Sequence, residues 1–124
     1  MPDFNLPSGC RMRFSASMEK EAVSRHRWSV ALSHSDDAPG SSPRAQYGAL
    51  IKSGETQRLD PPAIAADCIC RVAAMVEADG GWSADLAEVI VATPNDVTMV
   101  FTRPGESGTL DKCILAFELI PLAA

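Results

Sequence analysis

The side chains that could do chemistry in this 124-residue sequence begin with two histidines and four cysteines. Nucleophilic catalysis needs a serine or cysteine beside an oriented base, and His26 and His34 are the two conventional bases. No serine lies in a Gly-x-Ser-x-Gly turn. Cys10 falls on the inward phase of a predicted strand, where a thiol is poorly activated. The sequence therefore predicts no catalytic residue.

Two short groups of residues look like fragments of a metal site. Cys68 and Cys70 are separated by one residue, whereas structural zinc ligands are usually separated by at least two. His34, Asp36 and Asp37 lie together in a polar segment, where aspartates are common because they favour turns. We therefore expect no metal and no cofactor.

Phosphate binding is disfavoured both locally and across the whole chain. The glycine-rich segment from Gly105 to Gly108 lacks the lysine of a P-loop and carries Glu106, so it is read as part of a hairpin turn over residues 103–108. Eleven basic residues against sixteen acidic ones give a net charge of −5, which repels a nucleic-acid backbone. We expect that nucleic acid is not the partner.

The residues that could contact a protein partner are charged or amphipathic. Arginines are concentrated near the first predicted strands, Trp82 follows a double glycine, and the second half of the chain is acidic. A solvated face is the simpler explanation for the arginines, and closure of the core end is the simpler one for Trp82. The candidate partner-binding residues are Arg11, Arg13, Arg25, Arg27, Trp82, Asp85 and Glu88.

Export and membrane signals are absent from the pattern of apolar residues. The longest apolar runs have five residues, at 72–76 and 113–117, far below the roughly twenty that span a bilayer. The first residues lack the basic and apolar regions of a secretory signal. We expect no membrane association, a cytoplasmic location, and cysteines that are free thiols in the core.

Alternation of apolar and polar residues with a period of two indicates strands with one buried face. The alternation is clearest over residues 10–18 and recurs over residues 27–33, so we expect these strands to pair as a hairpin. Further extended segments are expected at residues 46–52, before Leu59, and at 89–91, 97–102 and 110–120.

A helix is predicted between these groups of strands. Asp60 followed by two prolines is typical of a helix start, and the Gly80-Gly81 pair is typical of a helix end. Apolar side chains recur between them at a helical spacing, at Ile64, Cys68, Val72 and Met75 or Val76. The sequence thus predicts one long helix over residues 61–79, with a helical turn at 83–86.

These elements predict an α+β fold class. We expect an antiparallel sheet of about five to six strands, covered on one face by the long helix (61–79). The chain length and the 46% hydrophobic content fit a single domain over residues 1–124. An irregular N-terminal arm (1–9) and a flexible polar loop (35–44) complete it, because both segments are rich in Pro, Gly, Ser or Asp.

Without a catalytic or cofactor signature, the sequence favours a small acidic, non-enzymatic protein-binding module. The expected class is a bacterial or phage inhibitor, immunity-type or adaptor protein that binds another protein by steric or electrostatic complementarity. One alternative is a structural subunit of a homo-oligomer, a homodimer included, or of a phage particle. Another is a small enzyme or ligand-binding domain whose pocket uses His26, His34 or Tyr47.

Overall fold

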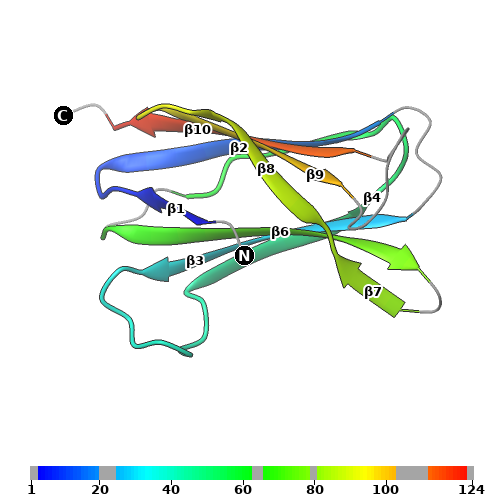
Figure 1. The fold of residues 1–124 in the computed structure, drawn as a ribbon. Coiled ribbons are helices and arrows are strands. Elements are labelled where there is room, and N and C mark those ends of the chain that lie inside the picture. The colour runs from blue at the N-terminus through cyan, green and yellow to red at the C-terminus, as the bar shows by residue number, and fades with distance from the viewer. Residues whose placement is uncertain (1–2, 20–24, 63–65, 79–80, 103–111, 123–124) are drawn as a thin grey trace.

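The chain folds as two antiparallel β-sheets packed face to face, as shown by a computed structural model (Figure 1). The structure describes residues 3–19, 25–62, 66–78, 81–102 and 112–122. Sheet A contains β1 (Asp3–Leu6), β3 (His26–His34), β4 (Ala45–Ile51), β6 (Cys68–Ala78) and β7 (Gly81–Ala84). Sheet B contains β2 (Cys10–Met18), β5 (Thr56–Leu59), β8 (Leu86–Ala92), β9 (Asp96–Thr102) and β10 (Cys113–Pro121).

Strand order brings distant parts of the chain side by side. In sheet A, β6 pairs with β3 on one edge, and with both β1 and β7 on the other. Sheet B has the order β5-β2-β10-β9-β8. Figure 1 shows β8 crossing from the layer that holds β7 to the layer of sheet B. Consecutive strands therefore switch sheets several times, which locks the two layers together.

Aromatic side chains fill the centre of the space between the sheets. The ring of Phe14 from sheet B lies 5.3 Å from that of Trp28 in sheet A and 5.4 Å from that of Phe117, measured between ring centres. The indole Nε1 of Trp28 donates a 2.7 Å hydrogen bond to Gln57, so its polar group is satisfied in a half-buried position. These contacts define one continuous core.

The predicted helix over residues 61–79 is wrong. Cys68–Ala78 form strand β6, and no helix occurs among the described residues. A spacing of four residues is shared by a helix face and a strand face, because four is also a multiple of two. Cys70 and Ala74 distinguish the two cases: both are buried with Cys68 and Val72, as a period of two requires. The α+β fold class is therefore replaced by an all-β sandwich.

Two further local expectations are wrong, although most strands are confirmed. The strands expected near residues 10–18, 27–33, 46–52 and 97–102 are present as β2, β3, β4 and β9. However, β2 and β3 do not form a hairpin, since they belong to different sheets. The helical turn expected at residues 83–86 is replaced by the end of β7 and the start of β8. The turn expected at residues 103–108 lies outside the described residues.

The N-terminal segment and the polar loop are both attached to sheet A. Within the segment expected as an irregular arm, Asp3–Leu6 pair with β6. The polar loop (35–44) is closed by two hydrogen bonds from Arg44 to Asp37, of 2.8 and 3.1 Å. None of the described residues forms a helix able to cross a membrane.

Candidate functional site

The outer face of sheet B carries polar side chains in ordered rows. Because paired residues on neighbouring strands point to the same side of a sheet, the backbone register places their side chains next to one another. One row consists of Asp96, Glu118 and Arg13. The next row consists of Thr98, Ala116, Ser15 and Arg58.

A small side chain in the middle of these rows creates a hollow. Ala116 is flanked by longer side chains, so the surface is depressed above its methyl group. The depression has a volume of about 510 Å³, and Phe14 and Phe117, which are buried in the core, also contribute to its lining. We call it the sheet-B hollow; its polar lining residues are Arg13, Ser15, Arg58, Asp60, Asp96, Thr98 and Glu118.

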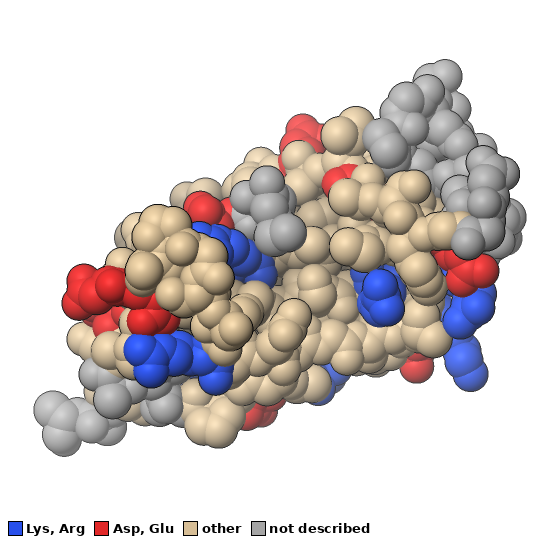
Figure 2. Space-filling model, turned by 90° about the horizontal axis from the view of Figure 1, so that it is seen from below, with Lys and Arg blue, Asp and Glu red and all other residues tan. Residues whose placement is uncertain are grey.

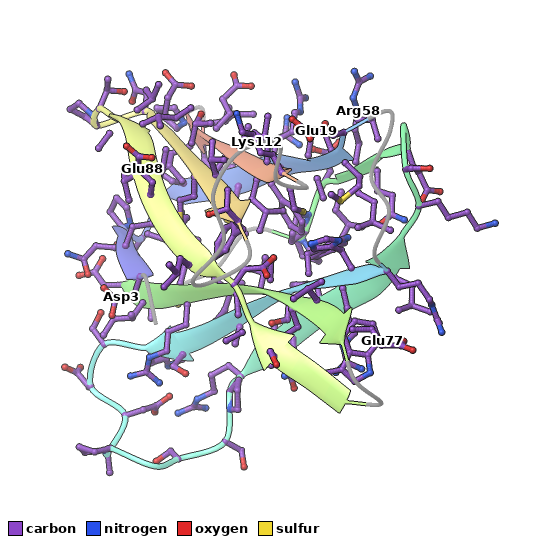
Figure 3. The ribbon with its side chains drawn as sticks, turned by 45° about the vertical axis from the view of Figure 1, so that its right-hand side comes forward. Asp3, Glu19, Arg58, Glu77, Glu88 and Lys112 are labelled. Carbon is purple, nitrogen blue, oxygen red and sulfur yellow. The ribbon has the colours of Figure 1, made fainter. Side chains whose placement is uncertain are left out.

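The sheet-B hollow offers hydrogen-bond donors and acceptors side by side. Arg13 Nε lies 3.0 Å from Asp60 Oδ1, and both side chains are about half exposed. Arg58 extends away from the sandwich on this side (Figure 3) and has no carboxylate partner in the described part of the chain. Two guanidinium groups, three carboxylates and two hydroxyl groups thus line the hollow. This set can bind a ligand that both donates and accepts hydrogen bonds.

The four predicted partner-binding arginines are divided between opposite faces. Arg11 and Arg13 lie on β2, on the outer face of sheet B. Arg27 lies on the outer face of sheet A, and Arg25 precedes the same strand and contacts Glu77 at 3.1 Å. Arg11, Arg13 and Arg27 therefore do not share the outer face of one hairpin, because β2 and β3 are in different sheets.

The other predicted partner-binding residues also occupy separate places. Trp82 is partly exposed on β7, and the guanidinium carbon of Arg27 lies 4.8 Å from its ring centre. Glu88 is exposed on β8, the strand at the end of sheet B (Figure 3). Asp85 has no exposed side-chain surface, and its Oδ2 lies 3.4 Å from the Nε2 atom of buried His26. Asp85 therefore belongs to the interior.

The interior contains a cysteine near this pair that does not have the properties of a nucleophile. Burial, with a smaller effect of the Asp85 carboxylate, raises the pKa of Cys113 from its ordinary value of 9.0 to about 12. The thiol is therefore protonated at neutral pH, and its side chain has no exposed surface. Burial likewise raises the pKa of Cys70 to about 12.

Metal-ligating side chains do not gather in the described part of the chain. Within these residues, no group of three or more His, Cys, Asp and Glu side chains is placed to hold an ion. Asp37, from the candidate cluster with His34 and Asp36, accepts hydrogen bonds from Arg44. These bonds hold the pKa of its carboxyl at about 2.

Most residues of the sheet-B hollow were missed by the sequence analysis. Arg13 was selected for its charge, whereas Arg58, Asp96 and Glu118 were not selected. Alternation places these residues on outward phases of their strands, and that signal was available in the sequence. The sequence does not show the strand order β5-β2-β10-β9, which brings these four strands together.

Comparisons with known proteins find similarity of fold alone. No protein-family model matches the chain, and no curated protein matches it. Among solved structures, the C-terminal domain of the BC2L-C lectin from Burkholderia cenocepacia is 19% identical with a TM-score of 0.44, covering 98% of this chain and 96% of that one. The Chromobacterium violaceum lectin CV2L, solved with alpha-methyl-fucoside, is 18% identical with a TM-score of 0.42 and the same coverage. At these values the similarity does not show which residues bind a ligand.

The function expected from the sequence is corrected by these findings. An inhibitor, immunity-type or adaptor protein was expected for a small acidic α+β domain without a catalytic signature, whereas the described residues form an all-β sandwich. No comparison supports another protein as the partner.

Proposed function

We propose that this protein is a non-enzymatic carbohydrate-binding domain that takes a neutral sugar in the sheet-B hollow. The observation that carries the proposal is an open depression of about 510 Å³ with guanidinium, carboxylate and hydroxyl groups around one small apolar side chain. A sugar hydroxyl group both donates and accepts hydrogen bonds, so it is best matched where donors and acceptors alternate. The methyl group of Ala116 can contact a C–H face of the ring.

The charge of the hollow favours a neutral ligand over an anionic one. Its lining contains Arg13 and Arg58 against Asp60, Asp96 and Glu118, which leaves one excess negative charge. A phosphate or sulfate group would meet more carboxylates than guanidinium groups. The hollow is also shallow, so it suits the terminal sugar of a larger glycan better than a small molecule that must be enclosed.

Titration with methyl glycosides, followed by backbone amide NMR, tests the proposal. The set includes the methyl glycosides of fucose, mannose, galactose and glucose, because fucose is the sugar in one of the similar structures. We expect at least one to shift amide signals around Ala116 with a Kd on the order of 1 mM, or about −4 kcal/mol. The variant Ala116→Leu fills the hollow and should abolish these shifts.

A matched variant separates loss of binding from loss of folding. Ala31→Leu makes the same substitution at a partly exposed position on the outer face of sheet A, and it should leave sugar binding unchanged. Absence of shifts with all four glycosides at 50-fold above the expected Kd, or shifts that persist in Ala116→Leu, would show that the hollow is not a sugar site. Release of free sugar from a glycoside would show that the protein is an enzyme.

The cytoplasmic location expected from the sequence also stays a proposal. Its support is that all four cysteines are free and that Cys68, Cys70 and Cys113 are buried, as is typical of proteins in reducing compartments. Fractionation of the source cells with an antibody against the protein checks it.

We also propose that a second copy of the chain covers β8, as a homodimer. β8 ends sheet B, all seven of its residues are exposed, and large apolar side chains make up much of it. The exposed fractions are 58% for Leu86, 50% for Val89, 54% for Ile90 and 41% for Val91. An edge strand with so few charges favours pairing with another strand.

Light scattering after size-exclusion chromatography tests the homodimer. The wild-type protein should elute at twice the chain mass of 13.2 kDa at high concentration, and Ile90→Lys should shift it to the monomer. Leu122→Lys, at a residue that is 45% exposed outside β8, is the control and should remain dimeric. A wild-type monomer at every concentration contradicts the proposal.

A further inference from the structure

The outer face of sheet A has a second hollow of a different chemical character. Backbone register places the row Leu50, Arg27 and Met75 beside the row Gly48, Ser29 and Ala73. The second row has only small side chains, so the surface is depressed along it. The depression has a volume of about 460 Å³ and is lined by Arg27, Trp28, Ser29, Gln46, Tyr47, Gly48 and Met75. We call it the sheet-A hollow.

Gly48 is required for this depression to form where it does. A Cβ atom at position 48 would lie 2.9 Å from the backbone oxygen of Trp28, which is closer than packed atoms allow. The absence of a side chain leaves the backbone of β3 and β4 open to a ligand. Figure 2 shows this face of the molecule, with an uncharged and hollowed middle and both basic and acidic side chains on either side of it.

Arg27 is held at the rim of the sheet-A hollow by uncharged groups. Its guanidinium carbon lies 4.8 Å from the ring centre of Trp82, and its Nη2 lies 3.8 Å from the sulfur of Met75. No carboxylate pairs with it among the described residues. Stacking on an aromatic ring orients a guanidinium group while leaving most of its N–H donors available.

The neighbouring arginines differ from Arg27 because their charges are already matched. Arg25 contacts Glu77 at 3.1 Å, and Arg44 contacts Asp37 at 2.8 Å. Neither of these arginines lines the sheet-A hollow, whose lining contains one cation, Arg27, and no carboxylate. The sheet-B hollow has the opposite balance, with three carboxylates against two guanidinium groups.

We infer that the sheet-A hollow is a binding site for an oxyanion, either a free anion or the acidic group of a sugar. The planar guanidinium of Arg27 can donate two parallel hydrogen bonds to a carboxylate, sulfate or phosphate group. Ser29 and Gln46 supply a hydroxyl and an amide for the rest of the ligand. This site does not depend on the proposed sugar site, because it lies on the opposite face of the sandwich.

Arg71 does not take part in binding the same group. It lies in register with Ala31, four residues along β3 from Arg27. At about 3.4 Å per residue this places the two arginines roughly 14 Å apart, which exceeds the screening length of about 8–10 Å at ordinary salt. Arg71→Ala is therefore a matched control with the same change in net charge.

Calorimetric titration with glucuronate, glucose and inorganic sulfate tests the site. We expect glucuronate to bind and glucose to bind at least tenfold more weakly at this face. Arg27→Ala should weaken glucuronate binding at least tenfold, whereas Arg71→Ala should change it less than twofold. Arg27→Lys keeps the charge but loses the planar pair of donors, so it should bind with an affinity between those of the wild type and Arg27→Ala.

The sulfate arm separates the two sources of the oxyanion. Sulfate binding as tight as that of glucuronate assigns the site to a free anion, and tighter glucuronate binding assigns it to an acidic sugar. Unchanged glucuronate binding in Arg27→Ala, with unfolding temperatures that show intact folding, overturns the inference. Ala116→Leu should not affect the glucuronate titration, so failure here and failure of the sugar site are distinguishable.

Discussion

Pairs of polar or charged side chains in this protein differ in their environment, and the difference sets how much each pair contributes to stability. The carboxylate of Asp85 lies in the interior at the crossover between β7 and β8, with His26 at 3.4 Å. Neither of its oxygens has a hydrogen-bond partner among the described residues. Glu77 and Arg25, by contrast, are partly exposed to solvent. Removing one member of a buried pair leaves the other member buried without that contact, whereas an exposed pair is screened by water.

We predict that Asp85→Ala lowers the free energy of unfolding by about 1–3 kcal/mol, because the buried imidazole of His26 loses the carboxylate beside its Nε2 atom. Glu77→Ala should lower it by less than about 1 kcal/mol, because it removes an exposed ion pair. Urea denaturation of both variants measures the difference. Similar small losses in the two variants would show that burial does not increase the contribution of Asp85 to stability.

The carboxyl of Asp37 provides a second prediction at the scale of residues. Hydrogen bonds from Arg44, followed by one from the backbone N–H of His34, lower its pKa from 3.8 to about 2. The interaction therefore stabilises the folded state above pH 3.8, and this contribution is lost as the pH falls through about 2. Carboxyl-carbon NMR should give a midpoint near 2 in the wild type and a higher one in Arg44→Ala. Arg25→Ala, away from the loop, should leave the midpoint unchanged.

Among the elements, β6 shows why a periodic pattern can predict the wrong structure. Its residues at positions 68, 72 and 76 fit a helix face and a strand face equally. The strand is stabilised by partners on both edges, namely β3 on one side and β1 with β7 on the other. Those partners are distant in sequence, so local helix signals such as Asp60-Pro61 do not include them. Long-range pairing therefore overrides the local preference.

The close approach of β3 and β4 gives a prediction for Gly48. Gly48→Ala places a methyl group 2.9 Å from the oxygen of Trp28, so the strands must separate. Inserting a methyl group into packed structure typically costs about 1–3 kcal/mol. Gly81→Ala is the control, since nothing lies within 4 Å of its added Cβ atom. Thermal unfolding should show a large loss for the first variant and little change for the second; equal effects would contradict the close approach.

For the molecule as a whole, the buried thiols make the free energy of unfolding depend on pH. The pKa values of Cys70 and Cys113 are raised by burial to about 12 in the folded chain, against an ordinary value of 9.0. Between these values the unfolded chain loses protons that the folded chain keeps, so stability is full below pH 9 and falls as the pH rises toward 12. Cys10 is partly exposed and should react first with a thiol reagent.

Urea denaturation from pH 8 to 11 measures this alkaline loss of stability. The double variant Cys70→Ala and Cys113→Ala should be less stable overall, because it leaves cavities, but its stability should fall less steeply with pH. Cys10→Ala should retain the wild-type slope. A slope that is the same in all three proteins would show that other groups cause the alkaline loss.

The positions and faces of many strands can be predicted from the amino-acid sequence, because burial on one side produces a period of two along the chain. Residues 10–18 and 97–102 were correctly predicted in this way, with Phe14 and Phe101 inward and Arg13 outward. Long-range strand pairing places β2 and β3 in different sheets, and it places Asp96, Glu118 and Arg13 in one row. The physical reason is that alternation reports whether a side chain is buried, whereas strand pairing depends on which distant segments bury one another.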